Sequence, residues 1–155
     1  MLIPGDVEAR AFPKNVYVIT SQWGDCRAGM TAAWITRVSA VPAMMAVAIH
    51  RGSYTREVIG HSGWFVIHAL PESGLELARC FGRGSSRSRD KFVGFSVAVS
   101  SHGQPVLTEA TAFLECQVVR SEDVGDHQLI VGEVVSGTEL RTGEPLRYRE
   151  EWFAP

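Results

Sequence analysis

The stretch Asn15-Val16-Tyr17-Val18-Ile19-Thr20-Ser21 decides the fold class that this sequence indicates. Its β-branched and aromatic residues favour extended backbone; Pro13 precedes it, and Gly24-Asp25 follows it as a turn. These features predict a strand. From Gly29 to Ile35 alternate side chains face opposite ways, which predicts a second strand that pairs with the first as a hairpin.

Short apolar runs separated by turn residues predict more strands along the rest of the chain. They cover Val41–Ile49, Trp64–Leu70, Phe95–Ser100, Ala112–Ser121 and His127–Ser136, with Glu122–Asp126 as the turn between the last two. About seven strands against two short helices indicate a mainly β domain, a sandwich or a barrel. No repeat, linker or composition break divides the chain, so we expect residues 1–155 to form one domain.

Two short helices are expected between these strands. Ser53 or Thr55 is a suitable cap for the first helix, and Gly60 is expected to end it. The second matches the S-x-x-E capping-box pattern that starts at Ser73, with Gly82 as its stop.

The overall charge is close to neutral, with 15 basic and 17 acidic residues. This balance argues against nucleic acid or an acidic membrane surface as a partner. Three separated cysteines form no CxxC pair, and five histidines are scattered singly, so neither disulfides nor a metal site are expected. Residues 1–6 lack the pattern of a signal peptide. We therefore expect a soluble protein of the reducing cytoplasm.

No motif of a nucleophilic or metal-dependent enzyme occurs in the sequence. Cys26 lies beside Arg27 in a turn, where a positive charge can activate a thiol, but an incidental exposed thiol is the simpler interpretation. His127 follows Gly125-Asp126 at a tight turn, where a histidine can act on a ligand at physiological pH. An ordinary surface turn explains the same pattern.

Two segments have the composition of anion-binding sites. His50-Arg51-Gly52-Ser53-Tyr54-Thr55 leads from a buried strand into a helix N-terminus, where N–H groups, hydroxyls and an arginine favour anions. The loop Gly82–Lys91 contains no hydrophobic residue and combines Gly and Ser with three arginines and a lysine. Simple helix capping and a solvated loop are the alternatives. Two such segments in one small domain favour a phosphorylated ligand.

Several segments together form a recognisable order along the chain. They are Val16–Ser21, Gly29–Trp34, the bend Val38–Pro42, His50–Thr55, Gly63–His68, Asp90-Lys91-Phe92, Leu114-Glu115-Cys116 and Gly125-Asp126-His127. From about residue 10 to the C-terminus this order resembles the flavin reductase-like family, the FMN-binding split β-barrels that include NAD(P)H:flavin oxidoreductases and flavoredoxins. The resemblance implies a Greek-key β-barrel with a few short helices, and a homodimer that holds one flavin in each of two grooves at or near its interface.

The resemblance also implies roles for residues at matching positions. The isoalloxazine ring would be lined by Thr31, Ala32, Ala33 and Trp34. The ribityl chain and phosphate would be held by His50, Arg51, Ser53, Tyr54 and Thr55. The phosphate would be covered by Ser86, Arg87, Arg89 and Lys91. His127 would position the nicotinamide. The sequence departs from the family at Ala33-Trp34, where Ser or Asn is common, and at His68, where Asn is common.

The activity that the resemblance implies is hydride transfer from NAD(P)H to FMN, with FAD as the other flavin to consider. The protein would act alone or as the reductase component of a two-component monooxygenase. The flavin supplies the redox chemistry, so no side-chain acid or base is required. The alternatives are a flavoredoxin-like electron carrier that serves a protein partner, and a non-catalytic flavin-binding dimer.

Overall fold

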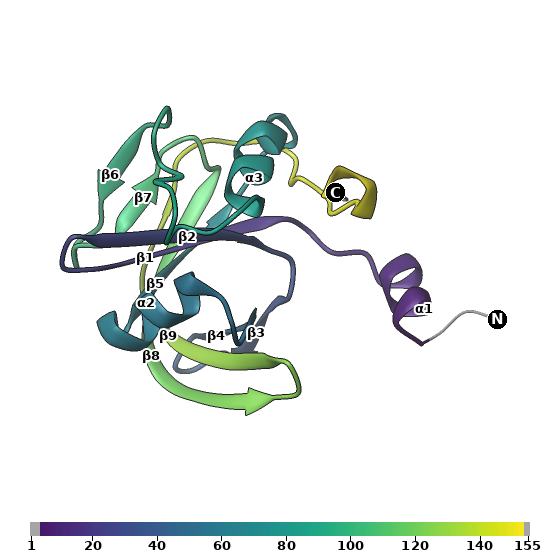
Figure 1. Cartoon of the computed structure of the whole chain (residues 1–155), viewed down its shortest axis with the longest axis horizontal. Coiled ribbons are helices and arrows are strands. Elements are labelled where there is room, and N and C mark those ends of the chain that lie inside the picture. The colour runs from purple at the N-terminus through teal and green to yellow at the C-terminus, as the bar shows by residue number, and fades with distance from the viewer. Residues whose placement is uncertain (1–3, 154–155) are drawn as a thin grey trace.

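Seven antiparallel strands form the main sheet in a computed structural model that describes residues 4–153 (Figure 1). Their order across the sheet is β2-β1-β5-β8-β9-β4-β3. Their bounds are β1 Tyr17–Trp23, β2 Cys26–Ala32, β3 Ile35–Ser39, β4 Met44–His50, β5 Trp64–Ala69, β8 Ala112–Val124 and β9 His127–Glu139. Residues 1–3, which belong to the N-terminal segment considered above, lie outside the described residues, as do residues 154–155.

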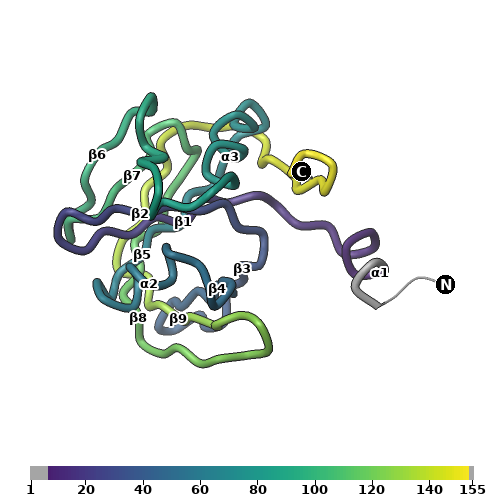
Figure 2. The backbone as a smooth tube through the Cα atoms, in the orientation of Figure 1, coloured from purple at the N-terminus to yellow at the C-terminus, as the bar shows by residue number. Residues whose placement is uncertain are grey.

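A smaller sheet and several short helices surround the main sheet. The small sheet pairs β6 (Val97–Val99) with β7 (Pro105–Leu107). The helices are α1 (Pro4–Ala11), α2 (Tyr54–Ser62) and α3 (Leu75–Gly82), with 3-10 turns η1 (Glu72–Gly74) and η2 (Glu150–Trp152). Both α2 and α3 contact the β1–β2 hairpin, on opposite sides of it, whereas α1 projects away from the sheet (Figures 1 and 2). None of the helices within residues 4–153 has the length and apolar character needed to cross a membrane.

Strand β1 is buried on both faces, which explains why its sequence is so clearly that of a strand. Val18 packs in one hydrophobic cluster with Leu77 and Phe81 of α3, whereas Ile19 packs in a second cluster with Ile59 of α2. Neighbouring residues of a strand face opposite ways, so a single apolar stretch supplies both clusters. The mainly β fold class and the predicted β1–β2 hairpin are confirmed.

The predicted second strand is wrong beyond Ala32. The chain leaves the sheet at Ala33 and Trp34 and returns as β3, which pairs with β4 instead of β1. The strand predicted from Val41 begins only at Met44, since residues 40–43 form the turn between β3 and β4. Alternation of side chains does not reveal such a break, because the residues on either side of it keep the same period.

Two predicted helix boundaries are wrong. Gly60 lies inside α2, which ends instead at Gly63, whose φ of 76° suits glycine. Ser73 lies in η1 and does not cap α3, whose N-cap residue is Gly74. Gly82 is the last residue of α3, close to its predicted stop.

The two longest strands exceed their predicted lengths, and two further elements are absent from the sequence-based prediction. Strands β8 and β9 have 13 residues each, so only Gly125 and Asp126 remain as the turn between them. Helix α1 and strand β7 carry only weak local patterns. Strand β7 is recognisable mainly from its burial in the fold, because all three of its residues are buried.

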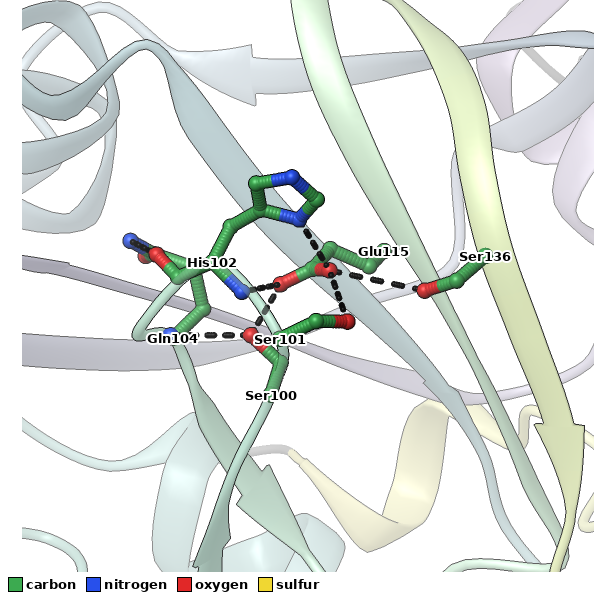
Figure 3. A network of polar contacts seen from close by, with 6 residues as sticks. All are labelled: Ser100, Ser101, His102, Gln104, Glu115 and Ser136. Carbon is green, nitrogen blue, oxygen red and sulfur yellow. Dashed lines mark hydrogen bonds and ion pairs between the residues drawn. The ribbon is translucent and has the colours of Figure 1, made fainter.

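A buried carboxylate holds the loop between β6 and β7 against the main sheet (Figure 3). Glu115 on β8 has no exposed surface. Its hydrogen-bond donors are the hydroxyls of Ser100, Ser101 and Ser136 and two nitrogens of His102. Burial alone raises a carboxyl pKa, but these hydrogen bonds outweigh it and lower the pKa of Glu115. The loop is therefore fixed by an ionised side chain.

His68 on β5 is a second buried polar residue with a structural role. Its Nε2 accepts a hydrogen bond from the Leu107 amide at 3.0 Å, which leaves Nδ1 to donate to the Val18 carbonyl at 3.0 Å. Burial lowers the pKa of His68 to about 4, so the imidazole is neutral at physiological pH. It joins β5 to β1 and β7.

Candidate functional site

A groove opens where the ends of β2 and β4 meet the start of α2. It consists of two adjoining cavities that share Met30, Thr31 and His50. The first, which we call the α2 cavity, has a volume of about 320 Å³ and is also lined by Gly52, Ser53, Tyr54, Thr55, Phe81, Gly82, Gly84, Ser85, Ser86 and Lys91. The second, the Trp34 cavity, has a volume of about 290 Å³ and is also lined by Glu8, Ala9, Lys14, Ala32, Ala33, Trp34, Ala48, His127, Tyr148 and Glu150.

The start of α2 makes one wall of the α2 cavity electropositive. Ser53 is the N-cap of the helix, and its hydroxyl accepts a hydrogen bond from the Arg56 amide. The remaining N–H groups of a first helical turn have no partner within the helix and carry partial positive charge. The hydroxyls of Tyr54 and Thr55 lie on the same turn and line the same cavity.

The loop after α3 makes the facing wall, and it is anchored to the free edge of β2. The Ser86 hydroxyl accepts from the Gly29 amide at 3.1 Å and donates to the Gly29 carbonyl at 3.2 Å. Lys91 Nζ donates to the carbonyls of Gly29 at 3.1 Å and Phe81 at 2.8 Å. Gly29 has to be a glycine, because a Cβ there would lie 2.5 Å from the Phe81 ring. These contacts hold the loop in a fixed place beside the groove.

Lys91 is a buried cation at the base of the α2 cavity. Only 3% of the residue is exposed. Burial, and next the positive charge of Arg89, lower the pKa of Lys91 to about 8. An ammonium has three N–H donors, and two of them bind the carbonyls described above. One donor is left for a ligand in the cavity.

Three arginines that the sequence assigned to the phosphate lie outside both cavities. Arg51 donates to the Gly125 carbonyl at 3.4 Å and pairs with Asp123 at 3.5 Å. Arg89 donates to the carbonyls of Cys80 at 2.7 Å and Arg83 at 3.0 Å, at the end of α3.

Arg87 lies at the rim of the α2 cavity. It pairs with Glu57, and its guanidinium lies 4.5 Å from the ring centroid of Tyr54. Tyr54 lines the cavity, so this contact places Arg87 beside one of the cavity walls. Its charge is nevertheless already matched by a carboxylate.

The Trp34 cavity has a small-residue floor and aromatic walls. Ala32, Ala33 and Ala48 supply side chains of a single methyl group. The ring centroids of Trp34 and His127 lie 4.6 Å apart with the planes tilted by 40°. His50 pairs with His127 across β4 and β9, and the two rings meet edge to face at 5.6 Å. Such a cavity suits a flat, largely apolar ring.

The Gly125-Asp126-His127 turn orients one of these rings. The Nδ1 of His127 lies 2.6 Å from a carboxylate oxygen of Asp126. This hydrogen bond from His127 is the main reason that the pKa of Asp126 is lowered. The carboxylate holds the proton on Nδ1 and leaves Nε2 for other contacts. His50 is fixed in a similar way, because its Nδ1 accepts from the Gly52 amide at 3.0 Å.

The structure thus brings together eleven of the fourteen residues that the sequence singled out, and leaves three outside the groove. Those in the groove are Thr31, Ala32, Ala33, Trp34, His50, Ser53, Tyr54, Thr55, Ser86, Lys91 and His127. The sequence reasoning missed Ser85 and Met30, which lie within segments that it had already selected. It also missed Tyr148 and Glu150, because nothing local in the C-terminal tail marks residues that reach the groove only through the fold.

The chemistry of the groove differs between its two ends. Within the described residues, no carboxylate lines the α2 cavity, which instead presents hydroxyls, backbone N–H groups and the Lys91 ammonium. These are the groups that bind phosphate. The Trp34 cavity offers the flat, alanine-floored space described above. The residues present therefore fit a molecule with a phosphate at one end and a planar ring system at the other.

Known proteins resemble this chain over most of its length. The chain is 30% identical over 149 residues to the ferric-chelate reductase (NAD(P)H) of Archaeoglobus fulgidus, covering 93% of this chain and 88% of that protein. It is 35% identical over 136 residues to the high molecular weight rubredoxin of Moorella thermoacetica, covering 86% of this chain but only 59% of the longer relative.

Structural similarity extends over nearly the whole chain. The NADH:FAD oxidoreductase of Streptomyces globisporus C-1027 superposes with a TM-score of 0.86 at 25% identity, covering 96% of this chain and 92% of that one. The family model described as the flavin reductase like domain matches residues 9–154. The chain therefore belongs to the flavin reductase-like family.

Proposed function

We propose that this protein binds FMN in the groove and acts as an NAD(P)H:flavin oxidoreductase. The observation that carries the proposal is the continuity of the two cavities, which join a carboxylate-free, hydroxyl-rich end to an alanine-floored end. The phosphate of FMN would lie in the α2 cavity and its ring system in the Trp34 cavity. Relatives named NADH:FAD oxidoreductase and ferric-chelate reductase (NAD(P)H) support the reaction class.

The α2 cavity favours a single phosphate over the diphosphate of FAD. Lys91 is the one cationic side chain among the residues that line it. Within the described residues, Arg51 and Arg89 bind protein carbonyls elsewhere and Arg87 at the rim is paired with Glu57, so no second unpaired cation is available for a second phosphate. We expect Ser53, Ser86 and Lys91 to contact the phosphate.

Bound flavin would supply the redox chemistry by accepting a hydride from the reduced nicotinamide. The protein's own contribution is to position the two rings relative to each other. The alanines of the Trp34 cavity would leave room for stacked rings, and Trp34 would pack against these rings from one side. His127, held by Asp126, is placed to accept at Nε2 a hydrogen bond from the nicotinamide amide or a ribose hydroxyl and so fix the approach of the nucleotide.

The proposal includes a homodimer and a downstream redox partner. We expect the dimer interface to cover half-exposed valines on β3, β8 and β9. They are Val38, Val119, Val124 and Val135. A monooxygenase that takes reduced flavin is one class of partner. Sedimentation velocity tests the dimer directly: a single monomeric species at micromolar concentration would contradict it.

A flavoredoxin-like electron carrier is the second candidate. It is favoured by the Moorella relative, whose name denotes a rubredoxin and of which this chain spans 59%. In that case reduced flavin would stay bound and pass electrons to another protein.

The two functions differ in what they do with free flavin and nicotinamide nucleotide. The purified protein is examined for a visible flavin spectrum, and NADH and NADPH oxidation is then followed with and without added FMN or FAD. Oxidation that rises with added FMN supports the reductase. A tightly bound yellow flavin with little turnover of added flavin supports the carrier. Flavin binding with no consumption of either nucleotide contradicts the reductase, and no flavin binding contradicts both.

A further inference from the structure

Trp34 occupies an unusual place for a large aromatic side chain. It stands in the two-residue connection between β2 and β3, and its backbone is fixed because the Ala48 amide donates to its carbonyl at 3.0 Å. The side chain lines the Trp34 cavity, yet 50% of the residue is exposed. Its ring packs on His127 at 4.6 Å, which leaves the remaining indole surface available to a ligand.

The charged groups around this indole make the cavity slightly acidic. Glu8 and Lys14 pair with one another at 2.8 Å and so offset each other. Glu150 also lines the cavity, and within residues 4–153 its carboxylate takes part in no ion pair. The ring of His127 packs on Trp34, and its Nδ1 lies 2.6 Å from the Asp126 carboxylate, which adds another acidic group next to the cavity.

An indole face is the strongest aromatic partner for a cation, and an unpaired carboxylate that lines the same cavity adds to this preference. We propose that Trp34 and Glu150 form a subsite that selects a pyridinium cation over a neutral ring of the same shape. The inference rests on the proposed function in one respect: the pyridinium in question is the oxidised nicotinamide of NAD(P)⁺.

The subsite bears on the reaction because the nicotinamide changes charge during it. In the reduced dinucleotide the ring is a neutral dihydropyridine. When its C4–H bond breaks and the hydride passes to flavin, the ring becomes a pyridinium with one positive charge. A site that prefers the cation stabilises this charge as it develops, and it also retains the oxidised product. The protein should therefore be inhibited by NAD(P)⁺ more strongly than affinity for NAD(P)H alone would suggest.

Two small probes isolate the charge preference from catalysis. Nicotinamide is neutral, and 1-methylnicotinamide is a pyridinium cation of nearly the same shape. Their affinities for the FMN-loaded protein are measured by calorimetry in wild type, Trp34→Leu, Trp34→Phe and Glu150→Gln. We expect wild type to bind the cation more tightly than nicotinamide. Trp34→Leu should lower the affinity for the cation by about 3- to 10-fold and hardly change the affinity for nicotinamide. Trp34→Phe and Glu150→Gln should give smaller losses of the same kind.

Trp23 provides the matched control. It is 52% exposed and stacks on a histidine, His61, at 4.3 Å, but it lines neither cavity of the groove. Trp23→Leu should leave both affinities unchanged. Equal weakening of both probes by Trp34→Leu, an effect of Trp23→Leu as large as that of Trp34→Leu, or no cation preference in wild type would overturn the inference.

The inference and the proposed function can fail separately. If wild type oxidises NADH or NADPH with flavin but shows no cation preference, the subsite is wrong and the reductase stands. If the preference depends on Trp34 but neither nucleotide is consumed, the reductase is wrong and the subsite stands. As a further readout, the inhibition constant of NAD⁺ should rise in Trp34→Leu by a larger factor than the KM for NADH.

Discussion

Lys91 donates a hydrogen bond of 3.1 Å to the carbonyl oxygen of Gly29, and this contact joins the loop after α3 to the outermost strand of the main sheet. An edge strand normally exposes backbone groups that face away from its neighbour. Here Ser86 and Lys91 satisfy those of Gly29. The same lysine lines the α2 cavity, so a single side chain anchors the loop and places a cation in the cavity that we propose for the phosphate.

This double role gives a prediction about flavin selectivity. Lys91→Met keeps the aliphatic stem but removes the charge. We expect the affinity for FMN to fall by about 10- to 100-fold relative to the affinity for riboflavin, which lacks the phosphate. Both affinities are measured by quenching of flavin fluorescence, and their ratio cancels any general loss of folding. Arg89→Met is the control: its guanidinium binds the carbonyls of Cys80 and Arg83 and lines neither cavity, so the ratio should change far less than in Lys91→Met. A larger effect of Arg89 than of Lys91 would contradict the assignment.

His127 should affect the nicotinamide nucleotide and leave flavin alone. His127→Gln removes the ring that Asp126 orients, and a lost hydrogen bond of about 1 kcal/mol raises the KM for NADH or NADPH roughly 5- to 10-fold. The Kd for FMN should change less than 2-fold. Steady-state kinetics and a flavin titration measure the two values. His61→Gln, which alters a histidine outside the groove, should change neither. A KM unchanged in His127→Gln would remove His127 from the site.

Two glycines on elements beside the groove should respond oppositely to alanine. Gly60 lies inside α2 with open space around its Cα, so Gly60→Ala should raise the free energy of unfolding by about 0.5–1 kcal/mol. At Gly29 the new methyl group would meet the buried Phe81 ring, and Gly29→Ala should lower it by about 1–3 kcal/mol. Urea unfolding measures both. Destabilisation by Gly60→Ala would mean that α2 stops at that residue after all.

Acid should destabilise the protein through His68. Its pKa is about 4 in the folded protein and 6.5 when unperturbed, so the unfolded chain binds the proton more tightly. The stabilisation is complete above pH 6.5 and is lost as the pH falls toward 4, which amounts to about 2 kcal/mol between pH 7 and pH 5. His68→Asn cannot titrate there. Its free energy of unfolding should therefore fall by about 2 kcal/mol less than that of wild type over this interval. Equal falls would show that His68 is not buried in the neutral form.

Much of the fold could be predicted from the sequence because the residues of β1 themselves indicate a buried strand. Its apolar residues serve a hydrophobic cluster on each face, and a turn with Gly24 ends it. The break at Ala33-Trp34 could not be predicted, since it depends on which strand pairs with β3, and that partner, β4, comes later in the chain. Likewise, a glycine such as Gly60 often ends a helix, but here the burial of Val58 and Ile59 stabilises the helix through this position.

The groove was predictable as far as residues adjacent in sequence define it. His50, Ser53 and Tyr54 lie together because they lead into one helix. The direction of a long side chain was not predictable. Arg51 and Arg89 lie in the segments that were expected to bind the phosphate, but their guanidinium groups donate to backbone carbonyls outside the groove. Glu150 and Tyr148 reach the groove from the far end of the chain, and only the fold brings them there.

We propose that the groove holds FMN where a nicotinamide nucleotide can reduce it. The most direct measurement is an anaerobic titration of the FMN-loaded protein with NADH and, separately, NADPH, followed by the visible absorption of the bound flavin. We expect at least one nucleotide to bleach the flavin stoichiometrically, and air to restore the spectrum. Protein that binds FMN but keeps its oxidised spectrum with an excess of both nucleotides would contradict it.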